Sequence, residues 1–285
     1  MFDLKLLKNS ATFVIPALFV AVFSWINIHF YKYGFIVLGF KLEEISFLII
    51  GLTLSHSLFS AVEQVLTSIY SSVYQRRVSS NPEKADEYWS DTIIGFIPIL
   101  MIFTWFYFSV AEYLPSLLLN ESYNSIYNYL LIGGIIEVCR ILLNLTYLRT
   151  QGINKTYLML KPYFLSFIVC FGIFSFFYYL DFLNLIFLSF LMAAMSFISF
   201  LILAYNIPKE IILNILKNLT FFFIISVVFL IACFFIKEIL ISIETPKLLI
   251  ILFLFFFWVI YGLYTVLNDK KINILNFSIE KEVIK

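Results

Sequence analysis

Apolar runs long enough to cross a membrane constrain this chain more than any other feature. Runs of roughly 20 residues, the length that a helix needs to span the hydrocarbon core, recur from one end to the other. Polar breaks separate them, and no break is long enough to hold a soluble domain. The runs cover about residues 11–33, 45–74, 91–114, 126–149, 157–179, 183–205, 217–240 and 247–268. The pattern predicts an all-α, polytopic integral membrane protein of about eight transmembrane helices, with residues 1–285 in a single membrane domain.

The composition supports this class and argues against several others. Hydrophobic residues make up 62% of the chain and charged residues only 13%, whereas a soluble domain carries about a quarter. The net charge of +1 indicates no nucleic-acid partner. The three cysteines, Cys139, Cys170 and Cys233, have neither metal-ligand nor disulfide spacing, and we expect them to be buried. The sequence lacks a phosphate-binding glycine loop, a nucleophile elbow and a metal-ligand cluster, so we expect no enzyme activity, cofactor or metal.

Positive charge predicts the orientation, because cytoplasmic loops of membrane proteins are enriched in Lys and Arg. With the N-terminus placed in the cytoplasm, fourteen of these residues fall inside and four outside. The inside set is Lys5, Lys8, Arg76, Arg77, Lys84, Arg149, Lys155, Lys161, Lys209, Lys217, Lys270, Lys271, Lys281 and Lys285, and the outside set is Lys32, Lys41, Lys237 and Lys247. Both termini are therefore predicted to be cytoplasmic, in agreement with an even number of spans. Abundant Phe, Ile, Tyr, Asn and Lys suggest an AT-rich bacterial genome and hence the bacterial cytoplasmic membrane.

The longest break, QRRVSSNPEKADEYWSD, carries a helix-start signal. Asn81 is a candidate N-cap, Pro82 would occupy the first turn and Glu83 follows it. We interpret this break as a short amphipathic helix that lies on the membrane and leads into the run at 91–114.

Polar residues form a stripe along the run at 45–74. At 100° per residue they share one face of a helix: His56, Ser60, Glu63, Gln64, Thr67, Ser71 and Tyr74, with Thr53 beside them. An acid at the centre of a membrane helix costs about 2.5–3.5 kcal/mol on insertion scales, so this face must contact protein or water. Packing against another helix would explain the hydroxyl residues, and a hydrated cavity would explain Glu63 and Gln64 better.

A second polar face lies on the run at 126–149. It contains Gly133, Glu137, Arg140, Asn144 and Tyr147. Glu137 and Arg140 are three residues apart, so they can pair along their own helix and offset much of each other's burial cost. Two interpretations stay open, a structural ion pair that locks this helix to a neighbour and an aqueous site where Arg140 binds an anion.

Three stretches carry a resemblance to a known family. They are LKNSATFVIPALFVAVFSWINIHFYKYGFIVLGFKLEEISFLIIGLTLSHSLF, LLLNESYNSIYNYLLIGG and LRTQGINKTYLMLK. In order and spacing they resemble the lipid-linked oligosaccharide flippases of the polysaccharide-biosynthesis membrane family, within the superfamily that includes multidrug extruders. The resemblance covers about residues 5–205 and matches the second of the two lobes of such transporters. Residues 206–285 would then be two additional transmembrane helices and a cytoplasmic tail.

The resemblance implies a function and roles for the polar residues. The substrate would be a polyprenyl-diphosphate-linked oligosaccharide, flipped across the bacterial inner membrane for polysaccharide, lipopolysaccharide or O-antigen biosynthesis. The partners would be membrane lipid, an N-terminal lobe and glycan-assembly membrane proteins. The candidate substrate-binding residues are His56, Ser60, Glu63, Gln64, Thr67, Glu137, Arg140 and Asn144, and the candidate diphosphate or membrane-surface contacts are Lys32, Arg76 and Arg77.

Two alternatives to this function stay open. In a drug or cation antiporter, Glu63 would exchange a proton or Na⁺ for an organic cation, and a second acid nearby in space would favour that reading. The other alternative is a truncated membrane protein that transports nothing, in which the polar faces only pack.

Overall fold

The computed structural model describes residues 14–23, 25–26, 35–36, 39–119, 121–153, 155–180, 184–243 and 245–268. Within these ranges the regular secondary structure is entirely helical. The α-helices are α2 (Leu42–Ser80), α3 (Ala85–Val110), α4 (Leu114–Leu118), α5 (Tyr127–Gly152), α6 (Leu160–Tyr179), α7 (Leu185–Tyr205), α8 (Lys209–Ser242) and α9 (Lys247–Asn268). Short 3₁₀ helices cover Pro82–Lys84, Glu121–Ile126 and Thr156–Met159.

The predicted class, an all-α polytopic membrane protein, is confirmed. In the part of the chain that the structure describes, six helices are long and apolar enough to cross a membrane. Two shorter apolar helices, Val14–Phe23 and Lys247–Gly262, lie where the first and last predicted runs fall. Lys32 and both chain termini lie outside the described residues.

In the longest break, the predicted helix start at Asn81 and Pro82 is confirmed, although Asn81 makes no side-chain cap hydrogen bond, and the predicted separate surface helix is wrong. Helix α2 continues through the polar segment to Ser80, and α3 begins at Ala85 after one 3₁₀ turn. Asn81 leaves the helical region, with φ −146° and ψ 85°, because the ring of Pro82 disfavours helical geometry in the residue before it. The polar break therefore consists of two helix ends that extend beyond the apolar segments, with a tight turn between them.

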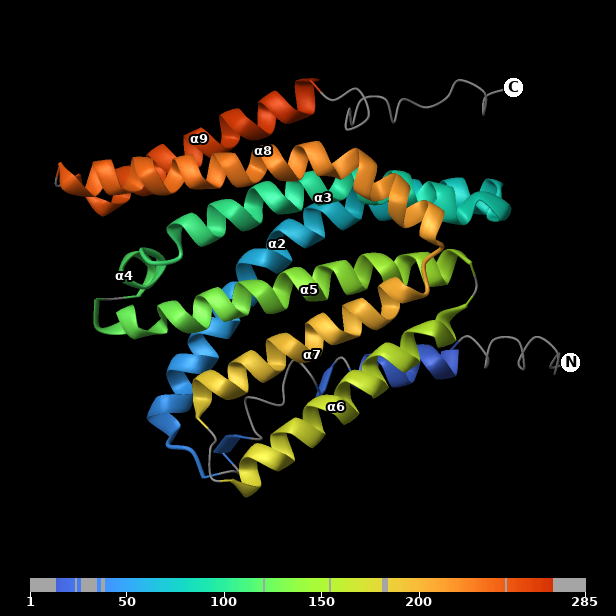
Figure 1. Ribbon diagram of the computed structural model, residues 1–285, viewed down its shortest axis with the longest axis horizontal. Helices are drawn as coiled ribbons and strands as arrows, with labels where there is room; N and C mark the ends of the chain where they lie inside the picture. Colours follow the sequence, from blue (N-terminus) through green and yellow to red (C-terminus); the bar gives the residue numbers. More distant parts are fainter. Residues whose placement is uncertain are drawn as a thin grey trace, which may run out of the picture.

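Successive long helices alternate in direction, and α5 lies in the middle of the bundle (Figure 1). One side of α5 contacts α2 and α3, and the other side contacts α7, which α6 covers. Helices α8 and α9 pack against α3 on the far side from α7. Because α2 and α5 run in the same direction, residues that are equally spaced along the two helices can face each other over several turns.

Small residues let α2, α3 and α5 approach closely. Gly133 lies directly against Ser55, so that even a methyl group there would meet the Ser55 side chain. A Cβ on the neighbouring Gly134 would lie 2.7 Å from the Tyr107 ring of α3. Helix interfaces in membranes commonly use small residues in this way, because lipid provides little hydrophobic drive for helix association.

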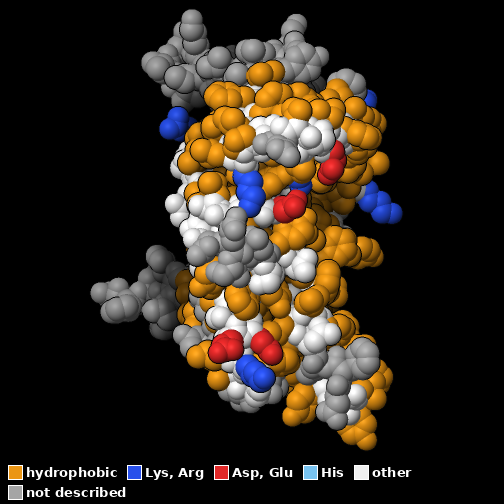
Figure 2. Space-filling view, turned by 90° about the vertical axis from the view of Figure 1, so that its left-hand side faces the viewer, with side chains coloured by type: hydrophobic (Ala, Val, Ile, Leu, Met, Phe, Trp, Pro, Cys, Tyr) orange, Lys and Arg blue, Asp and Glu red, His pale blue; other side chains and the backbone are white. Residues whose placement is uncertain are grey.

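The two ends of the bundle differ in charge. Figure 2 views the molecule from the end that holds α4 and the start of α2, where hydrophobic side chains predominate and acidic and basic groups are scattered among them. The described Lys and Arg residues at the helix ends on this side are Lys41, Lys237 and Lys247. Eight lie at the opposite end, namely Arg76, Arg77, Lys84, Arg149, Lys155, Lys161, Lys209 and Lys217. The alternation of helices thus gathers the predicted inside segments at one end and the predicted outside segments at the other.

We expect a cysteine at Ser80 to react with an impermeant thiol reagent only after the cells are permeabilised. A cysteine at Ser125, at the opposite end, should react in intact cells, because the positive-inside rule places that end outside. The native cysteines are buried and should give little background. Strong labelling of Ser80→Cys from outside would reverse the orientation.

Candidate functional site

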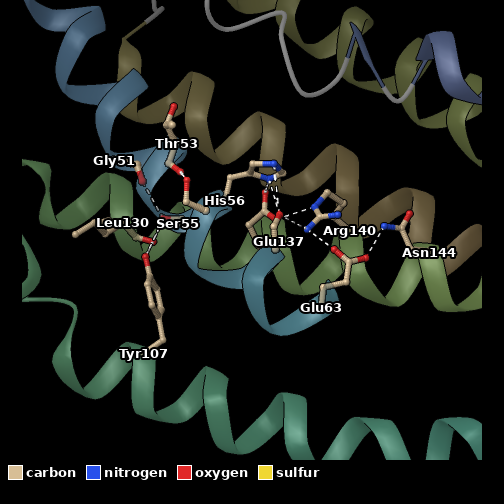
Figure 3. A network of polar contacts seen from close by, with 12 residues as sticks. Gly51, Thr53, Ser55, His56, Glu63, Tyr107, Leu130, Glu137, Arg140 and Asn144 are labelled. Carbon is tan, nitrogen blue, oxygen red and sulfur yellow. Dashed lines mark hydrogen bonds and ion pairs between the residues drawn. The ribbon is translucent and has the colours of Figure 1, made fainter. Parts of the chain in front are cut away.

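An acid–base network joins α2 to α5 near the middle of both helices (Figure 3). Arg140 is at its centre. Its Nε donates to Oε2 of Glu137 at 2.7 Å, and its Nη2 lies 2.7 Å from Oε2 of Glu63 across the interface. The same Nη2 donates to Ser60 Oγ at 3.3 Å. The guanidinium is therefore shared between two carboxylates from two helices, and the expected pairing of Glu137 with Arg140 is confirmed.

The remaining carboxylate oxygens are also paired. His56 Nδ1 lies 3.0 Å from Oε1 of Glu137, and Asn144 Nδ2 donates to Oε1 of Glu63 at 2.7 Å. The Glu137 and Glu63 side chains are 7% and 12% exposed, whereas the His56 side chain is 42% exposed. The His56 imidazole and the exposed Asn144 amide are thus the parts of the network that reach the surface of the bundle.

Matched spacing explains why these side chains meet. His56 faces Glu137 and Glu63 faces Asn144, so the same offset of 81 residues holds at both ends of the network. On α2, steps of four and three residues separate His56, Ser60 and Glu63 and keep them on one face of the helix. On α5, steps of three and four residues do the same for Glu137, Arg140 and Asn144. Two helices that run in one direction therefore bring the polar stripes into register.

A neutral hydrogen-bond cluster supports the network one turn toward the start of α2. Ser55 Oγ donates to Gly51 O at 2.9 Å and lies 2.8 Å from the Tyr107 hydroxyl of α3. The Tyr107 hydroxyl donates to Leu130 O at 2.8 Å (Figure 3). This cluster ties α3 to the α2–α5 interface.

Of the two interpretations left open for Glu137 and Arg140, the network has the geometry of the ion pair that locks the helix to a neighbour. Glu63, Ser60, Glu137, Arg140 and Asn144 face one another across the helix interface, because pairing buried charges costs less than hydrating them separately in a membrane.

The other candidate residues lie outside this network. Gln64 is exposed, and the Thr67 hydroxyl donates to the Glu63 carbonyl of its own helix at 2.7 Å. Arg76 is exposed at the end of α2, and Arg77 pairs with Asp91 at 3.1 Å. The structure thus unites six of the candidate residues and leaves Gln64, Thr67, Arg76 and Arg77 apart from them. Lys32 lies outside the described residues.

Sequence reasoning missed a second buried ion pair. Arg149 of α5 is 3% exposed and donates to both carboxylate oxygens of Asp86 at the start of α3, at 2.7 and 3.2 Å. Its guanidinium also lies 5.9 Å from the centre of the Trp89 ring. In the sequence Arg149 stood out only as a positive charge at a helix end, although Asp86, within the polar break on the same predicted side of the membrane, was a signal for a partner.

The described residues contain no group of three or more His, Cys, Asp and Glu side chains placed to hold a metal. The three cysteines are buried, as expected from their apolar surroundings. No family model, curated protein or solved structure matches the chain.

We expect the surface beside the network to be hydrated. A cysteine at exposed Gln64 should react with a small water-soluble thiol reagent in intact membranes, because Gln64 lies beside Glu63 on the polar side of α2. The matched control is Val65, which is 62% exposed but apolar, so a cysteine there should face lipid and stay unreactive. Equal protection at the two positions would mean that no water reaches this side of α2.

Proposed function

We propose that this membrane protein is a transporter, or one lobe of a transporter, in which the α2–α5 network binds and releases the coupling cation. The observation that carries the proposal is the network's unequal charge near the middle of two helices that are long and apolar enough to cross a membrane. Two carboxylates, on Glu63 and Glu137, share one guanidinium on Arg140. Ionisable residues inside membrane segments are costly, and by default they indicate ion or proton pathways.

The charge excess gives the site its chemistry. With a neutral imidazole the network carries one net negative charge, and with a protonated imidazole it is neutral. The His56 side chain is 42% exposed, whereas the side chains of Glu63, Glu137 and Arg140 are 12%, 7% and 15% exposed, so His56 is the ionisable member of the network most open to exchange with water. A proton on His56, or a small cation in its place, would remove the cost of the excess charge.

The cargo proposed first is a polyprenyl-diphosphate-linked oligosaccharide, on the strength of the sequence resemblance. In this conformation Arg140 is held by Glu137, Glu63 and Ser60, so it would have to release a carboxylate before it could bind a diphosphate. The network is accordingly proposed as the coupling site, and the sugar and diphosphate would be bound elsewhere along the polar side of α2.

The second candidate is an antiporter for organic cations, and one observation favours it. Glu63 and Glu137 lie on either side of the same guanidinium, so a second acid does accompany Glu63 in space. Such a pair of acids suits exchange of a proton for an organic cation.

A flux measurement tests both candidates. The protein would be reconstituted in liposomes with a pH difference of about two units, containing either a fluorescent polyprenyl-diphosphate oligosaccharide or ethidium. We expect the pH difference to accelerate movement of the glycolipid, and a protonophore or Glu137→Gln to remove that acceleration. Acceleration of ethidium alone would establish the second candidate, and fluxes equal to those of protein-free liposomes would contradict both.

A further inference from the structure

A cavity of about 340 Å³ opens between the ends of α2 and α5, at the end of the bundle that is rich in Lys and Arg. Its size is within the range of about 300–1,000 Å³ that is usual for small-molecule sites. Its walls are formed by Tyr74, Gln75, Val78, Ser79, Pro82, Leu148, Gln151 and Gly152. It lies away from the network: Gln75 is twelve residues beyond Glu63, or about 18 Å along the helix.

The walls offer hydrogen bonds that the protein does not use. The amides of Gln75 and Gln151 have no hydrogen-bond partner among the described residues, and each offers two donors and a carbonyl acceptor. The Ser79 hydroxyl donates to Arg76 O at 2.8 Å, which leaves its oxygen free to accept. The Tyr74 hydroxyl is buried without a partner against Gly152, beneath the same wall.

The charge of the walls restricts the ligand. None of the wall residues is ionisable near neutral pH, and the adjacent Arg149 is already engaged by both oxygens of Asp86. A carboxylate or phosphate would therefore find no cation in the walls. Hydroxyl groups, which donate and accept at once, fit the paired amides, and Val78, Pro82 and Leu148 provide an apolar surface for a sugar ring or the first carbons of a lipid.

We propose that this cavity binds the uncharged sugar headgroup of a membrane glycolipid. Its place at the helix ends, where lipid headgroups lie, favours a sugar carried on a lipid over a free sugar. In the proposed transporter, this site would bind the sugar part of the cargo, and that role rests on the proposed function. The binding of a glycolipid in the cavity does not depend on it.

Photolabelling tests the site without any transport. The full chain in phosphatidylcholine nanodiscs would be exposed to a monohexosyl diacylglycerol with a diazirine on its sugar, or to a phosphatidylcholine with a diazirine on its headgroup. We expect the hexosyl probe to label the segments 75–82 and 148–152 about tenfold more than the choline probe. Unlabelled monohexosyl diacylglycerol should compete, and glucose at the same concentration should not.

Matched variants separate recognition from folding. Gln75→Leu combined with Gln151→Leu should lower labelling about tenfold, because the sugar loses hydrogen bonds to two amides. Ser68→Leu, which changes an exposed polar residue of the same helix away from the cavity and from the polar face, should leave labelling unchanged. Equal labelling by both probes, full competition by glucose, or unchanged labelling of the double variant would overturn the proposal.

The outcome is separable from that of the proposed function. Failed labelling with intact pH-driven glycolipid flux would refute the sugar site alone. Specific labelling without any pH-driven flux would refute the transport function and leave a glycolipid-binding membrane protein.

Discussion

Arg140→Ala should destabilise the folded protein more than any other single change to an ion pair. The substitution leaves Glu137 and Glu63 close together, buried and without their shared guanidinium. Removing one partner of a buried ion pair costs about 3–5 kcal/mol, because the remaining charge is left uncompensated. We expect a large loss of folded, monodisperse protein after extraction and a matching fall in the free energy of unfolding in a mild detergent.

Two further variants show whether charge is the cause. Replacing Arg140 by Met together with Glu63→Gln and Glu137→Gln removes all three charges and should restore most of the folded yield. Arg77→Ala is the control, because the Arg77 and Asp91 side chains are 40% and 46% exposed and such pairs contribute about 0–1 kcal/mol. If Arg140→Ala were as stable as Arg77→Ala, the carboxylates would not both be ionised in the native protein.

Gly133→Val should have the second large effect, through packing. Gly133 touches Ser55, which in turn bonds Tyr107 and the Gly51 carbonyl, so a branched side chain would push α2 and α5 apart at this contact. Overpacking of this kind costs about 1–3 kcal/mol, and separation of the helices would also lengthen the contacts of Arg140 with Glu63. The free energy of unfolding should fall accordingly.

Gly172 of α6 provides the control for the glycine substitution. A Cβ on Gly172 would meet nothing within 4 Å, so Gly172→Val should be tolerated. Similar losses at the two positions would mean that the effect comes from valine in a helix and not from contact with Ser55.

The helices could be predicted from the sequence because bilayer thickness and helical rise together set the length of an apolar run. The same argument does not locate helix ends. The polar break around Asn81 was interpreted as a separate surface helix because it is polar, yet the backbone hydrogen bonds of α2 continue until Pro82, which lacks an N–H. A helix ends where its backbone bonding ends, and side-chain polarity is a weaker guide.

The candidate site was only half predictable. Periodicity placed His56, Glu63 and Arg140 on polar faces, because the angle between residues on one helix follows from their spacing. It could not reveal that the two faces meet, since the offset of 81 residues depends on the direction and register of α2 relative to α5. Ser55 and Tyr107 were missed for a simpler reason: a serine and a tyrosine in apolar helices carry no signal until their partners are known.

The most direct test of a coupling site on α2 and α5 is the charge that moves when protons are supplied, which requires no knowledge of the cargo. Liposomes that contain the protein would be adsorbed to a solid-supported membrane and exposed to a rapid drop in pH. We predict a transient current in the wild-type protein, because protons enter the membrane to reach the network. The current should vanish in Glu63→Gln/Glu137→Gln, measured at equal amounts of folded protein. Currents of equal size in both proteins, or none in the wild type, would show that the network only holds the two helices together.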